Sequence, residues 1–75
     1  MNLEAVLQEV REFAIECVWK NKEECVKASD SMIEVYLKSL MPEKDFEVFL
    51  RFKEVMLKEF RKSAEEELDF LNDKS

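Results

Sequence analysis

The sequence predicts a single all-α domain, on the grounds of chain length, composition and the spacing of apolar residues. The 75 residues suffice for one domain. They include no glycine and one proline, whereas the tight turns of an all-β fold need residues that tolerate positive φ. Apolar residues recur at three- and four-residue steps, as they do on amphipathic helices. We therefore expect a helical hairpin or three-helix unit with a long C-terminal helix, its helices spanning about residues 3–20, 22–41 and 43–71.

The first predicted helix, over residues 3–20, has one apolar face that covers an arc of about 140°. Ile15 and Trp19 fall outside this arc, together on one flank of the helix. The residues of the apolar face are Leu3, Val6, Leu7, Val10, Phe13, Ala14, Cys17 and Val18.

The second predicted helix, over residues 22–41, ends before Pro42, which cannot continue a helix without losing a hydrogen bond. Its start is open, because Asn21 and Ser31 each begin a capping-box pattern, and the apolar phase also allows one continuous helix over residues 3–40. Val26, Ile33 and Leu37 widen its apolar face. The face itself comprises Cys25, Ala28, Met32, Val35, Tyr36 and Leu40.

The third predicted helix spans residues 43–71. Pro42 suits the start of its first turn, and Glu43 and Asp45 suit the positive end of its dipole. The short link at Met41 and Pro42 predicts that it packs antiparallel to the preceding helix. Its apolar residues cover an arc of roughly 200°, which is wide for a helix with one neighbour. The main stripe is Phe46, Phe49, Leu50, Met56, Leu57, Phe60, Ala64, Leu68 and Leu71, and a second stripe is Val48, Phe52, Val55 and Phe70.

The two cysteines are expected to be reduced and to serve as small buried hydrophobes. The first residues lack a basic region followed by an apolar run, so no signal peptide is predicted and the cytoplasm is the expected compartment. Cys17 and Cys25 lie eight apart and would face each other if the chain turned at Asn21, but two cysteines without histidine do not complete a zinc site. Replacing Cys17 and Cys25 with Ala or Val is expected to change stability by about 1 kcal/mol.

Enzymatic chemistry is not predicted, and neither a cofactor nor a metal ion is expected. The chain has no histidine, which removes the commonest general base, and no glycine, which removes the usual phosphate-cradling loop. Two carboxylate pairs, Glu9 with Glu12 and Glu66 with Asp69, have a spacing that suits a divalent cation. We interpret both as solvated helix faces, because Glu9 and Glu12 point away from the apolar arc.

The charge distribution disfavours direct binding of nucleic acid. The formal net charge is −6, residues 65–75 alone sum to −4, and the only basic stretch, Arg51 to Lys62, is interrupted by Glu54 and Glu59. The opposite hypothesis is an acidic inhibitor that mimics DNA and blocks a nucleic-acid-binding partner. Its carboxylates would be the row formed by Glu4, Glu9, Glu12, Glu16 and Glu23.

The apolar content predicts a second buried surface. A chain this short buries only about 60% of its unfolded surface as a monomer, yet 47% of its residues are hydrophobic. We therefore predict a homodimeric helical bundle and a non-enzymatic, regulatory or interaction role in the cytoplasm, with a protein partner and no membrane contact. The predicted partner-binding residues are Ile15, Trp19, Val48, Phe52, Val55 and Phe70.

Overall fold

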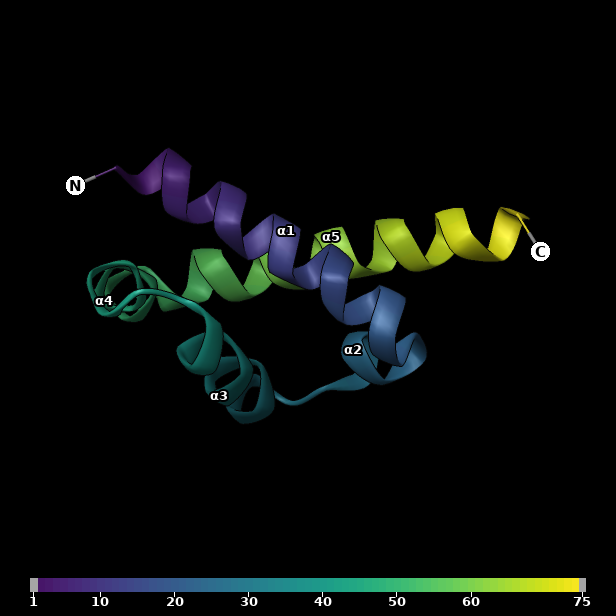
Figure 1. Cartoon of the computed structure of the whole chain (residues 1–75), viewed down its shortest axis with the longest axis horizontal. Coiled ribbons are helices and arrows are strands. Elements are labelled where there is room, and N and C mark those ends of the chain that lie inside the picture. Colours follow the sequence, from purple (N-terminus) through teal and green to yellow (C-terminus); the bar gives the residue numbers. More distant parts are fainter. Residues whose placement is uncertain (1, 75) are drawn as a thin grey trace.

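The computed structural model describes residues 2–74 and is all-helical, with no strand in that range. Five helices follow one another along the chain (Figure 1). They are α1 (Leu3–Asn21), α2 (Glu23–Lys27), α3 (Asp30–Leu40), α4 (Glu43–Arg51) and α5 (Lys53–Lys74). The predicted fold class is thus confirmed at the level of an all-α chain.

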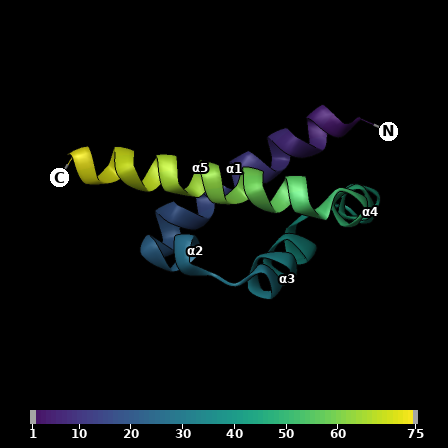
Figure 2. The same ribbon diagram turned by 180° about the vertical axis from the view of Figure 1, so that it is seen from behind.

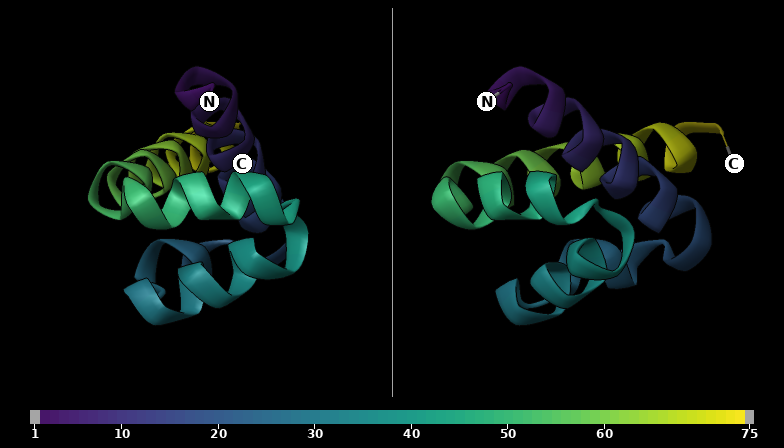
Figure 3. Two further views of the ribbon diagram at one scale, coloured as in Figure 1. Left: turned by 90° about the vertical axis from the view of Figure 1, so that its left-hand side faces the viewer. Right: turned by 60° about the vertical axis from the view of Figure 1, so that its left-hand side comes forward.

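The two long helices, α1 and α5, form the principal pair, and they run in the same direction (Figures 1 and 2). Arg11 bonds to Glu59 and Trp19 bonds to Glu67, so at both positions a residue of α1 meets the residue 48 positions later in α5. A constant offset of this kind defines a parallel pairing. The helices α3 and α4 lie across this pair on one side, as the end-on and side-on views show (Figure 3). The helix directly preceding residue 43 is therefore not the main neighbour of α5, contrary to the sequence prediction.

The second predicted helix is divided, because the chain breaks near both candidate starts, although neither Asn21 nor Ser31 serves as the cap. Lys22 has φ 49°, a region that favours glycine, and it separates α1 from α2. Ala28 and Ser29 are extended, and the Ser29 hydroxyl accepts a hydrogen bond from the Met32 N–H at 3.3 Å to cap α3. One continuous helix over residues 3–40 is therefore wrong.

The third predicted helix is also divided, at Phe52 (φ −116°, ψ 37°). No glycine or proline marks this break, so local sequence does not predict it. The break turns α4 away from the axis of α5 and lays it beside α3, to which the short link at Met41 and Pro42 ties it (Figure 3). Tertiary packing thus overrides a local helical preference at Phe52.

The core lies where α3 and α4 cover the α1–α5 pair. Tyr36 of α3 meets Phe60 of α5 edge to face, with ring centroids 6.3 Å apart, and Phe46 stacks on Phe49 within α4 at 5.4 Å. The predicted apolar face of the first helix and most of the main stripe of the third are confirmed, with Leu50 left exposed. The largest fully buried side chains are Phe49, Phe60, Ile33, Leu37, Met56, Val10 and Val18.

The predicted apolar face of α3 is wrong. Ile33 and Leu37 are fully buried, whereas Met32, Val35 and Leu40 are exposed. The reason is the extended pair of residues before α3, which interrupts the count of 100° per residue and rotates the helix about its axis. Among the described residues, no helix is long and apolar enough to cross a membrane.

Candidate partner-binding surface

Two of the predicted partner-binding residues, Ile15 and Trp19, lie one turn apart on α1, at the seam with α5. Trp19 is 60% exposed, and its indole Nε1–H donates a hydrogen bond of 2.7 Å to Glu67 Oε2 on α5. Ile15 is 37% exposed. The parallel register sets Ile15 beside residue 63, so both side chains follow the edge of the helix pair.

Phe70 extends this edge on α5. It lies one turn after Glu67, the partner of Trp19, and is 47% exposed. The Lys74 ammonium lies 4.8 Å from the centre of its ring, a cation–π contact that covers one ring face. We call the surface formed by Ile15, Trp19 and Phe70 the Trp19 flank.

The end of α5 projects past the end of α1 (Figures 1 and 2). Because α1 ends at Asn21 and the offset is 48, the last residue of α1 is level with Asp69. Phe70 and Leu71 follow that level, although Leu71 still packs against the edge of the core. A depression of about 250 Å³ is found here, lined by Trp19, Lys22, Leu68, Leu71 and Asn72.

Acidic side chains lie on either side of Phe70 along α5. Glu66 precedes Phe70 by one turn and Asp73 follows it by one turn. Within residues 2–74, neither of these carboxylates forms an ion pair. The bases Arg11 and Lys20 on α1 are already engaged, by Glu59 at 2.6 Å and by Glu16 at 2.8 Å. The flank is therefore acidic on its Phe70 side, whereas the base Lys22 lines the depression beside Trp19.

The other three predicted residues, Val48, Phe52 and Val55, lie near the opposite end of α5. Phe52 and Val48 are half-buried against the chain's own core, and Val55 is exposed. Val55 and Phe70 are 15 residues apart on α5, which corresponds to about 22 Å. The six predicted residues thus form no single patch.

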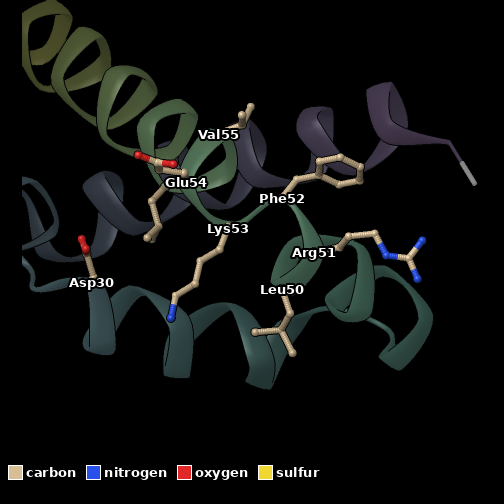
Figure 4. Close-up of a pocket in the computed structure, with 8 residues that line it drawn as sticks. Asp30, Leu50, Arg51, Phe52, Lys53, Glu54 and Val55 are labelled. Carbon is tan, nitrogen blue, oxygen red and sulfur yellow. The ribbon is translucent and has the colours of Figure 1, made fainter.

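A cavity of about 580 Å³ lies on the α3 side of the α4–α5 break (Figure 4). Phe52 points away from Leu50 and Lys53 in this view, which agrees with its role in packing on the core. Lys53 reaches α3, where its Nζ lies 2.8 Å from Glu34 Oε2. Arg61 of α5 likewise pairs with Asp30 of α3. Two ion pairs therefore hold α3 on α5 beside this cavity.

Sequence reasoning missed an apolar surface on α3. Met32 and Val35 are 62% and 69% exposed, and a groove of about 510 Å³ runs between α3 and the C-terminal end of α1. Its walls include Met32, Tyr36 and both cysteines. The available signal was Ser29, a capping residue three before Met32, which would have restarted the helical phase.

Cys17 and Cys25 form a disulfide, so the expectation of two reduced thiols is wrong. The turn at Lys22 brings the end of α1 against α2, and both cysteines are buried there. Persistent disulfides are typical of oxidising compartments, whereas cytosolic thiols are generally kept reduced.

A carboxylate pair that sequence spacing did not predict joins α1 to α4. Glu9 is hydrogen-bonded to Asp45 rather than paired with Glu12. Burial, followed by the hydrogen bond and the charge of Asp45, raises the pKa of Glu9 to about 7. In the part of the chain that the structure describes, no group of three or more Cys, Asp or Glu side chains is arranged to hold a metal ion.

Comparison with known proteins provides no functional assignment. No protein-family model matches the chain, and neither the curated proteins nor the solved structures contain a significant match. Its function is therefore inferred from its surface alone.

Proposed function

We propose that this chain is a small non-enzymatic interaction module that binds another protein through the Trp19 flank. The observation that supports this most directly is Trp19, the only tryptophan, which is 60% exposed and yet held in place by Glu67. Tryptophan is enriched among the residues that dominate binding energy at interfaces. Because the hydrogen bond to Glu67 already positions the indole, the Trp19 side chain would lose little conformational entropy when a partner binds.

The competing explanation for Trp19 is that it caps the core at the end of α1. A tryptophan that caps the core would bury most of its ring, whereas Trp19 is mostly exposed. The large buried aromatic side chains are Phe49 and Phe60. Ile15, one turn earlier, adds a second partly exposed apolar group on the same side. This continuity favours a binding surface over an isolated exposed side chain.

The test compares Trp19→Ala with Val55→Ala, which removes a similarly exposed apolar side chain far from the Trp19 flank. Each tagged variant and the wild type are expressed in the source cell, and co-purifying proteins are quantified by mass spectrometry. Trp19→Ala should reduce one or more specific partners by at least about tenfold, the scale of an interface hot spot, whereas Val55→Ala should not. Equal partner recovery with Trp19→Ala would contradict the proposal, provided that thermal melts show both variants folded.

The alternative function is an acidic inhibitor that occupies a nucleic-acid-binding site. The overall charge of −6 supports it, but three of its candidate carboxylates have basic partners within the chain: Glu4 with Arg11, Glu16 with Lys20 and Glu23 with Lys27. Paired carboxylates imitate a phosphate row poorly. If this function is correct, duplex DNA should displace the chain from its partner, and the Trp19→Ala variant should still bind that partner. The second result separates this function from the first proposal.

We further propose that two copies of the chain associate. Val48 and Phe52, which belong to the second apolar stripe predicted to bind a partner, pack on the chain's own core. The more exposed apolar side chains are Met32 and Val35 on α3, and they are the better candidates for this contact. Sedimentation at micromolar concentration should give about twice 9.0 kDa, and Val35→Glu should shift the mass to that of a monomer. A folded wild-type monomer at that concentration would contradict dimerisation.

A further inference from the structure

We propose that the Cys17–Cys25 disulfide is a redox switch: it holds α2 against the end of α1, and its reduction releases α2 while the other helices stay folded. The helix α2 lies beside the end of α1 and is joined to α3 by an extended link (Figures 1 and 2). Neither Trp19 nor a partner takes part in this switch, so it stands apart from the proposed function.

The helix α2 has few contacts of its own to hold it in place. It has five residues, far fewer than an isolated helix needs, and within the described chain no side chain caps its start. Its charged residues are exposed and Val26 is half-buried, so Cys25 is its one buried side chain. The disulfide is attached at that side chain. Breaking the bond therefore removes the covalent link at the one point where α2 is anchored in the core.

The turn before α2 depends on the same bond. Lys22 has φ 49°, a region in which a non-glycine residue persists only where its surroundings hold it. The disulfide does so, because it keeps the Cα atoms of Cys17 and Cys25 6.0 Å apart. Eight residues of uninterrupted helix would set these atoms about 12 Å apart. Reduction thus removes the constraint that keeps Lys22 in this conformation.

The far end of α2 is anchored separately, which confines the opening to residues 22–27. Ala28 is extended, and Arg61 of α5 donates a hydrogen bond of 3.0 Å to its carbonyl oxygen. The same guanidinium pairs with Asp30 at the start of α3. Residues 22–27 contain none of the largest fully buried side chains. The helix α3 is therefore fixed to α5 without help from α2, and the core does not depend on the segment that opens.

A dithiol reaches the disulfide from the groove of about 510 Å³ between α1 and α3, which both cysteines line. One thiolate of the dithiol attacks a sulfur of the disulfide, which forms a mixed disulfide and releases the other cysteine as a thiolate that takes up a proton. The second thiol of the dithiol then displaces the remaining cysteine. The dithiol leaves as a disulfide, and Cys17 and Cys25 carry its two electrons and two protons.

The released segment changes the surface of the molecule. The groove loses the wall that Glu24 and Cys25 provide, whereas Met32 and Tyr36 stay in place on α3. Whether the groove keeps this wall is therefore set by the redox poise of the surroundings.

Trypsin digestion tests the release of α2 by comparing the oxidised wild type with the double variant Cys17→Ser, Cys25→Ser. The bonds after Lys22 and Lys27 lie in the released segment, and those after Lys58 and Lys62 lie in α5. The bonds after Lys22 and Lys58 are both followed by glutamate, which matches them chemically. Cleavage after Lys22 and Lys27 should be at least about tenfold faster in the double variant, whereas cleavage in α5 should stay slow.

The variant Ile33→Ala is the matched control, because it destabilises the core but keeps the disulfide. It should raise cleavage at all four sites in the same proportion, as expected for global unfolding. Dithiothreitol should reduce the wild-type disulfide in native buffer, at urea concentrations far below the unfolding midpoint. Reoxidation should then restore resistance to cleavage after Lys22.

Four outcomes would overturn the inference. The first is equal cleavage after Lys22 in the oxidised wild type and the double variant. The second is a parallel rise in α5, which would make the disulfide a structural cross-link only. The third is reduction by dithiothreitol only where urea unfolds the protein, which would exclude access through the groove. The fourth is a double variant that circular dichroism shows to be unfolded, since the remaining helices should fold without the disulfide.

Discussion

At the scale of single residues, the clearest departure from expectation is the pair of cysteines. Their spacing of eight is compatible with pairing only if the chain reverses between them, and Lys22 supplies that reversal with φ 49°. A non-glycine residue in this region costs on the order of 1–3 kcal/mol and persists where its surroundings enforce it. The disulfide is one such constraint, since it joins the two sides of the turn.

We predict that the double variant Cys17→Ser, Cys25→Ser lowers the free energy of unfolding by about 2.5 kcal/mol, because a cross-link closing a loop of this length restricts the unfolded chain by that amount. This exceeds the effect of about 1 kcal/mol expected for two buried thiols. Urea unfolding of both proteins, with and without reductant, measures the difference.

In that experiment the reductant should destabilise the wild type and leave the variant unchanged. Complete alkylation of Cys17 and Cys25 in folded protein taken directly from the cell would show that the thiols are free there. That result would restore the prediction of a reducing compartment.

At the scale of elements, α3 shows how one break changes which residues are buried. Adjacent side chains of this helix differ sharply, with Ile33 1% exposed and Met32 62% exposed. The 11 residues of α3 are too few for a stable isolated helix, so its formation depends on the face it packs. That face is anchored by Ile33 and Leu37, and the Ser29 cap sets where it begins.

We predict that Ile33→Ala destabilises the fold by about 2–4 kcal/mol, because it leaves a cavity in the core. Val35→Ala, two residues later, should change the stability of the dilute, monomeric chain by less than about 0.5 kcal/mol, since this side chain is exposed there. Chemical denaturation of both variants provides the comparison. Similar losses from the two variants would mean that the face predicted from the uninterrupted phase is the buried one.

At the scale of the whole molecule, the contacts between helices distant in the chain include a titratable link. Glu9 on α1 is hydrogen-bonded to Asp45 on α4, and Glu12 also contributes negative charge. The surrounding depression contains Lys44, Glu47 and Arg51. Sharing a proton between the two carboxyls is favourable, whereas two facing carboxylates repel each other.

We predict that this link makes the fold less stable as pH rises from about 4.5 to about 7. The pKa of Glu9 is raised from 4.5 to about 7 in the folded state, so the folded chain binds more protons than the unfolded chain in that interval. Above pH 7 the penalty is fully present. Because Glu9 is partly exposed and screened by solvent, we expect a loss of only about 1 kcal/mol.

Glu9→Gln isolates this contribution from that of the other carboxyls. The variant should be more stable than the wild type at pH 8 by about 1 kcal/mol and should match it near pH 4. Urea midpoints at the two pH values measure the change. A wild type and variant with parallel pH profiles would show that Glu9 titrates normally in the fold.

The sequence by itself determined the all-α class, the buried face of α1 and most of the buried stripe of α4 and α5. These depend on local spacing, since an uninterrupted helix repeats its faces every 3.6 residues and apolar side chains on one face are driven into the core. The exposed positions of Ile15 and Trp19 follow from the same rule, because both fall outside the arc that α1 buries.

Only the tertiary structure decided the parallel pairing of α1 with α5, the break at Phe52, the rotation of α3 and the disulfide. Each depends on contacts between residues far apart in the chain or on a backbone turn without a glycine or proline to mark it. A break of one or two residues resets the helical phase of every side chain that follows.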